Sequence, residues 1–168
     1  MPDVGNVAAI PLRDGYGACQ VTGLGPTACA LDWFSTDLPD RDRLAGCRPL
    51  VLDHHALRGQ PTEVTIAGDE PPPPWWIWLG RLALAPGRSD RAGDHAGWPW
   101  LAAQIAAQRR WDNELPPAAK QAYRDGTGKA TTLLDLTAGG SSWSTGSDTP
   151  EPYPGCYARL ALPRVFGA

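Results

Sequence analysis

The stretch that decides the fold runs from residue 4 to residue 22 and reads VGNVAAIPLRDGYGACQVT. Its first half, which ends at Leu12, is short, apolar and β-branched, as strands commonly are. The residues Arg13-Asp14-Gly15 then supply an Asp-Gly pair suited to a turn with positive φ. From Tyr16 the side chains resume a period-two alternation. The sequence therefore predicts a β-hairpin at the start of the chain.

The residues that follow the hairpin extend the predicted sheet. A third strand over residues 27–34 completes a three-stranded meander, and an acidic turn with capping residues leads into a short helix at about residues 40–45. Residues 48–55 and 63–68 are predicted as the fourth and fifth strands. The prolines at 71–74 cannot donate hydrogen bonds to a sheet, so they mark an internal boundary of the domain.

The second half of the chain, residues 75–168, combines Trp- and Ala-rich segments with long polar loops. Residues 75–84 are predicted as one more buried strand, and strand alternation places Trp76 and Trp78 on one face and Trp75 and Ile77 on the other. Trp98-Pro99-Trp100 opens the best predicted helix, which should end before Pro116. Its apolar stripe consists of Leu101, Ile105, Gln108 and Trp111.

Three further elements are predicted towards the carboxyl end. A second helix covers residues 116–124 and is closed by Gly126, and strands follow at 131–137 and 157–162. Together the elements predict a single α+β domain over residues 1–168. Its antiparallel sheet is curved, as a meander or a partly open barrel, with two or three helices packed on one side. Residues 1–74 form the β-rich part, and residues 75–168 form an extension with helices and closing strands.

Composition excludes several classes of protein. The 15 basic and 18 acidic residues leave a net charge of −3, which lacks the cationic field that nucleic-acid binding requires. No apolar stretch is long enough for a membrane span, and the amino-terminal residues do not have the pattern of a secretion signal, so we expect a cytoplasmic protein. The four cysteines form no CxxC pair, and we expect them to be reduced. Neither a metal nor a cofactor is expected.

The order of short motifs in the first half resembles the immunity protein 26 family of bacterial polymorphic toxin systems. The resemblance covers about residues 3–75 and rests on Gly5 to Leu12, Asp14 to Gly17, Gln20-Val21, Asp32 to Pro39 and Asp53 to Leu57, followed by a strand that ends at Gly68 and prolines. The family tends to have a Trp in that last strand, where this chain has Val64. The resemblance implies a protein that binds and neutralises a cognate toxin.

Two groups of residues are candidates for catalysis or metal binding. Asp53 could orient a neighbouring histidine, and Asp53 and His55 can share a strand face, whereas His54 and His55 point to opposite faces. His95, which lies in a Gly-rich loop with Asp90 and Asp94, could make a metal site together with His54 or His55. No GxSxG, HExxH or paired Cys–His pattern accompanies either group, so we interpret them as structural or surface residues and expect no enzyme.

Tryptophans and aspartates are the candidates for partner binding. Five of the eight tryptophans fall between Trp75 and Trp100, and most of these are expected in the core, with one or two rings partly exposed. The acidic segment after residue 31 is typical of a solvated face but also suits a cationic partner. The candidate contact residues are Asp32, Trp33, Asp37, Asp40, Asp42, Trp75 and Trp98. A small saccharide-binding module that uses the Trp cluster is the alternative hypothesis.

Overall fold

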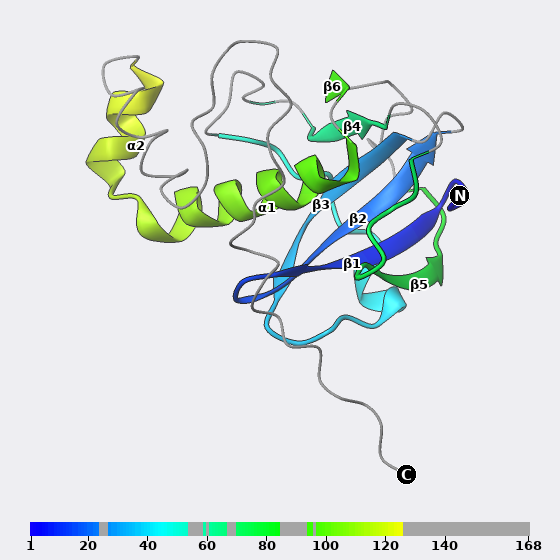
Figure 1. The fold of residues 1–168 in the computed structure, drawn as a ribbon. Coiled ribbons are helices and arrows are strands. Elements are labelled where there is room, and N and C mark those ends of the chain that lie inside the picture. The colour runs from blue at the N-terminus through cyan, green and yellow to red at the C-terminus, as the bar shows by residue number, and fades with distance from the viewer. Residues whose placement is uncertain are drawn as a thin grey trace.

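The computed structural model describes residues 1–23, 27–53, 59, 61–66, 70–84, 94–95 and 97–125. Within these ranges the protein is a six-stranded sheet in the order β5-β1-β2-β3-β4-β6, with a long helix on one face (Figure 1). The predicted α+β class with a curved antiparallel sheet is confirmed, while β6 pairs in parallel with β4. The strands predicted at 131–137 and 157–162 lie outside the described residues, as does Gly126.

The predicted hairpin and meander form the centre of the sheet. The three central strands are β1 (Asn6–Leu12), β2 (Gly15–Gly23) and β3 (Thr27–Ser35). Leu12 pairs with Gly15, so Arg13 and Asp14 form the turn. Neither of them has positive φ, because no residue other than glycine does in the described part of the chain. The predicted turn position is therefore right, and the positive φ expected of its Asp-Gly pair is found at Gly15, whose φ is 153°.

Shorter strands flank this centre. They are β4 (Glu63–Thr65), β5 (Ile77–Arg81) and β6 (Asp94–His95). The strand β5 is shorter than predicted, and it is half-buried to exposed rather than buried, since it lies at the edge of the sheet.

The regular strand predicted over residues 48–55 is wrong in the described part of that range. Only isolated bridges form there, between Leu31 and Pro49 and between Val51 and Pro61. Leu50 nevertheless donates its N–H to the carbonyl of Ala30 at 2.8 Å. Prolines at both bridges remove backbone donors that a regular ladder would use.

Both helices predicted for the second half of the chain are present. The helix α1 (Gly97–Glu114) covers one sheet face, and α2 (Pro117–Arg124) follows beyond its end, away from the sheet (Figure 1). The four residues of the predicted α1 stripe are all buried. The sheet floor beneath α1 is built from small side chains, among them Ala8, Cys19, Ala28 and Ala30. This floor lets the large side chains of α1 approach the strands closely.

One glycine sets how closely the helix approaches. A Cβ atom built on Gly17 of β2 would lie 2.8 Å from Cγ2 and 3.1 Å from Cδ1 of Ile105 in α1. Real Cβ atoms essentially never show such a contact, so this crossing of helix and strand requires glycine.

A smaller apolar cluster covers the other sheet face, where η1 (Arg41–Leu44) replaces the predicted short helix. Leu44 packs there against Val7, Ala18 and Leu31. Helical cover therefore lies on both faces rather than on one side. The face also buries Gln20, whose Nε2 donates to the carbonyl oxygens of Gly5 and Leu82, each at 3.1 Å.

Candidate functional site

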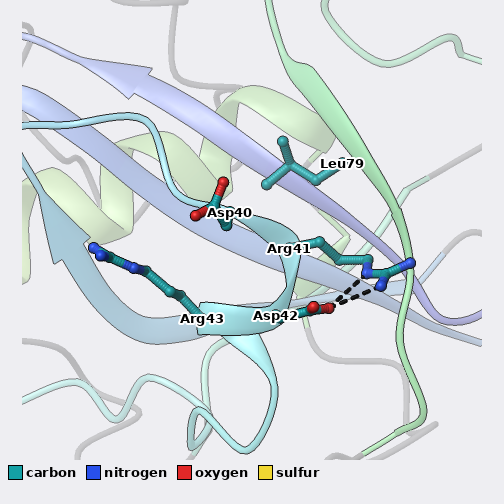
Figure 2. Close-up of a pocket in the computed structure, with 5 residues that line it drawn as sticks. All are labelled: Asp40, Arg41, Asp42, Arg43 and Leu79. Carbon is teal, nitrogen blue, oxygen red and sulfur yellow. Dashed lines mark hydrogen bonds and ion pairs between the residues drawn. The ribbon is translucent and has the colours of Figure 1, made fainter.

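A surface depression with a volume of about 580 Å³ lies beside η1. Asp40, Arg41, Asp42, Arg43 and Leu79 line it, and Figure 2 shows Leu79 of β5 facing the charged residues of η1. The short helix forms because the N–H of Arg43 returns to the carbonyl of Asp40 at 3.1 Å. All four charged residues are exposed, so the depression is open to a large partner.

Two carboxylates and two guanidinium groups line this depression, so their formal charges balance. The Arg41 guanidinium pairs with Asp42, whose Oδ1 lies 2.8 Å from Nη2 (Figure 2). Asp40 precedes η1, and its side chain makes no capping hydrogen bond. Its carboxylate is therefore available to a partner without loss of a helix cap.

The acidic segment continues upstream of η1 on exposed residues. Ser35 Oγ accepts the N–H of Asp37 at 3.1 Å, which holds this turn, and the Asp37 side chain is exposed. Leu38 is 47 % exposed, and Leu79 is half-buried at the floor of the depression. We call Asp37, Leu38, Asp40, Asp42 and Leu79 the η1 surface. It combines carboxylates with apolar side chains, as protein-binding surfaces do.

A second, narrower cavity of about 120 Å³ lies between the end of β3 and α1. We call it the β3–α1 cleft. Its lining residues are Leu31, Asp32, Trp33, Phe34, Leu50, Ile105, Gln108, Arg109 and Asp112. The helix contributes residues 108, 109 and 112 to it because positions i and i+4 share one helix face.

Gln108 organises the polar side of the β3–α1 cleft. Its Oε1 accepts the backbone N–H of Asp53 at 2.9 Å, and its Nε2 donates to Asp112 Oδ1 at 3.0 Å. Burial raises the pKa of the Asp112 carboxyl, and the nearby charges of Asp53 and Asp32 raise it further. The hydrogen bond from Gln108 and the charge of Lys120 oppose that rise. Carboxylates from three different segments therefore influence one another here.

The cation of the β3–α1 cleft is held against an aromatic ring. The guanidinium carbon of Arg109 lies 3.6 Å from the centroid of Phe34, which is a cation–π contact. Among the described residues, Arg109 forms no ion pair with Asp32 or Asp112. The two carboxylates that line the cleft thus keep capacity for another cation.

The predicted contact residues fall into separate places. Asp40 and Asp42 line the η1 depression, Asp37 lies just upstream of it, and Asp32 and Trp33 line the β3–α1 cleft. Sequence reasoning missed Gln108, Arg109 and Asp112 as cleft residues. Their spacing on one helix is visible in the sequence, but the proximity of β3 is not.

The assignment of Trp98 to partner binding is wrong, because its side chain is only 1 % exposed. Its ring packs edge-on against Trp76 and Trp78, with centroids at 5.6 and 6.2 Å, and its Nε1 donates to the carbonyl of Glu70 at 3.1 Å. The predicted shared face of Trp76 and Trp78 is consistent with these contacts. Trp75 is 39 % exposed and remains accessible.

Of the candidate catalytic and metal-binding residues, the structure describes Asp53, Asp94 and His95. Asp53 bonds to Gln108, whereas His54, His55 and Asp90 lie outside the described residues. His95 belongs to β6. Within the described ranges there is no group of three or more His, Cys, Asp or Glu residues that could hold a metal ion.

Two observations concern cysteines and membranes. Cys19 and Cys29 are buried cysteines, and burial raises the pKa of the Cys19 thiol, which disfavours its reactive thiolate form. Among the described helices, none has the length and apolar character needed to cross a bilayer.

Comparison of the chain with models of protein families, with curated proteins and with solved structures finds no match.

Proposed function

We propose that this chain is an immunity protein that binds a cognate bacterial toxin through the η1 surface and neutralises it. The observation that carries the proposal is the exposed arrangement of Asp37, Asp40 and Asp42 beside Leu79, where three carboxylates outnumber the two guanidinium groups of Arg41 and Arg43. Such a surface suits a broad cationic protein face, because complementary charge speeds encounter while apolar contacts hold the complex. The motif order over residues 3–75 gives the class of partner.

The alternative, a saccharide-binding module, depends on accessible tryptophan rings. Trp75 is the only exposed tryptophan among the described residues, whereas Trp76 and Trp98 are buried. One exposed ring is a small stacking platform, so the arrangement favours a protein partner. Titration with a glycan panel, followed by tryptophan fluorescence, would support the alternative if the emission shifted saturably.

The proposal is tested by co-expression with the toxin encoded by the neighbouring gene. We expect the wild-type chain to restore growth and to copurify with the toxin. A variant with Asp37, Asp40 and Asp42 changed to Asn should associate more slowly, with a smaller dependence of the association rate on salt. The side chain of Asp40 caps no helix, so this variant should remain folded.

A matched control removes the same charge elsewhere. Asp3, Asp14 and Asp125 are exposed and lie outside the η1 surface, and their change to Asn should leave toxin binding intact. The proposal fails if no neighbouring product forms a complex. The assignment of the η1 surface fails if the two triple variants lose binding equally.

A further inference from the structure

The β3–α1 cleft is too small for most free ligands. Its volume of about 120 Å³ lies well below the roughly 300–1,000 Å³ of pockets that enclose drug-sized molecules. A sugar ring with its neighbours or a nucleotide would not be enclosed there. The volume instead fits the head group of a single side chain.

The chemistry of the cleft selects the sign of the charge on that head group. Asp32 and Asp112 line the cleft, and Asp53 adjoins it through Gln108. Two cations oppose these three carboxylates: Arg109, whose guanidinium is already stacked on Phe34, and Lys120, whose charge acts on Asp112. The balance is negative, so a cation is favoured and an anion is repelled.

Both carboxylates that line the cleft keep hydrogen-bond acceptor capacity that the fold does not use. In the described part of the chain the side chain of Asp32 makes no hydrogen bond or ion pair, and only its backbone N–H is engaged, by the carbonyl of Arg48 at 2.8 Å. Asp112 accepts one hydrogen bond from Gln108, and Lys120 Nζ donates to the backbone carbonyl of Asp112 rather than to its carboxylate. Oxygen atoms of both carboxylates therefore remain available as acceptors, and the rings of Trp33 and Phe34 line the same space.

We propose that the β3–α1 cleft receives the cationic head of one arginine or lysine side chain of the protein partner. Asp32 of β3 and Asp112 of α1, both exposed, bind that head, and the rings of Trp33 and Phe34 line the space around it. The identity of the partner as a toxin rests on the function proposed above. The cleft then gives that interface an anchor residue, which the broad η1 surface lacks.

The test uses the ¹⁵N-labelled full chain and Nα-acetyl-arginine methylamide as the probe. We expect saturable shifts of the backbone amides of Asp32, Gln108 and Asp112. The citrulline analogue has nearly the same shape without the charge, and it should produce none. Asp32→Asn and Asp112→Asn should each bind the probe about tenfold more weakly, which is the scale of one charge-assisted hydrogen bond. Asp14→Asn, at the exposed hairpin turn, should bind it like the wild type.

Several outcomes would overturn the inference. Equal shifts with the citrulline analogue would show that charge is not recognised, and unchanged affinity in both cleft variants would show that the probe binds elsewhere. Much tighter binding of spermidine at the same amides would identify a polyamine receptor instead of a protein contact. If the toxin binds the wild type and both cleft variants equally, the inference fails while the proposed function stands. If the toxin does not bind the wild type, the proposed function fails. The toxin is then also ruled out as the protein that supplies the arginine or lysine side chain.

Discussion

Replacing Gly17 by alanine is expected to destabilise the protein, because the added methyl group enters the contact between β2 and α1. It would lie 2.8 Å from Ile105 Cγ2 and 3.3 Å from Leu12 Cδ1. Ile105 is 2 % exposed, so its side chain cannot turn out towards solvent. Overpacking of this kind costs about 1–3 kcal/mol. The loss of glycine's freedom in the unfolded chain offsets roughly 0.4–1 kcal/mol of that, since the φ of Gly17 is not positive.

The net loss for Gly17→Ala is therefore about 0.5–2 kcal/mol. Urea unfolding should show a lower midpoint with an unchanged slope, and the Tm should fall by roughly 2–6 °C. Ile105→Ala, which removes both clashing atoms, should cost about 2–5 kcal/mol alone but about 1 kcal/mol less in the Gly17→Ala background. The reasoning is refuted if Gly17→Ala is as stable as the wild type, or if the two substitutions are additive.

Three further predictions concern buried polar, charged and aromatic groups. Gln20→Leu should lose about 1–3 kcal/mol of unfolding free energy in urea, because the partly buried carbonyl of Leu82 loses the donor that the buried Gln20 side chain supplies. Unchanged stability would contradict this. The pKa of Asp112 is raised in the folded protein, so folding favours the protonated carboxyl. The contribution of Asp112 to stability is therefore present at low pH and is lost as the pH rises through the raised pKa. Asp112→Asn should therefore be more stable than the wild type at pH 7, with the difference vanishing near pH 3 (~1 unit below the ordinary carboxyl pKa); a less stable variant at pH 7 would argue against the assignment. Trp98→Ala should lower the free energy of unfolding by about 3–5 kcal/mol, because the ring is buried, whereas Trp75→Ala, at an exposed ring, should lower it by less than about 1 kcal/mol. Thermal melts followed by circular dichroism would contradict this if the two variants were destabilised equally.

Local sequence signals predicted the hairpin and the helices well, because each depends on neighbours in the chain. The register from Leu12 to Gly15 follows from the short turn, and α1 follows from the spacing of Leu101, Ile105, Gln108 and Trp111. The failure at residues 48–55 has a local cause, since the apolar run indicated a strand but Pro49 lacks the N–H that a ladder needs.

The residues of the candidate sites were harder to predict, because their environments are assembled from distant segments. Asp40 and Asp42 were predicted as contact residues from one short segment, and they lie together because Asp40 precedes η1 and Asp42 belongs to it. Trp98 was misplaced because an interface ring and a core ring look alike in sequence, and its burial depends on Trp76 and Trp78, some 20 residues upstream. The β3–α1 cleft joins Asp32 to Asp112 across most of the described chain, and no local pattern records that proximity.

The helix α1 and the strands beneath it contribute side chains of different size to the core between them. The strands contribute Ala8, Ala28 and Ala30, and the helix contributes Leu101 and Ile105. The two sides should therefore tolerate different substitutions. In a saturation library, larger side chains should destabilise the protein at the strand positions, and smaller ones should do so at the helix positions. Homologous sequences should then vary in helix side-chain shape only together with compensating changes in strand side-chain size, which makes this interface a source of covarying pairs.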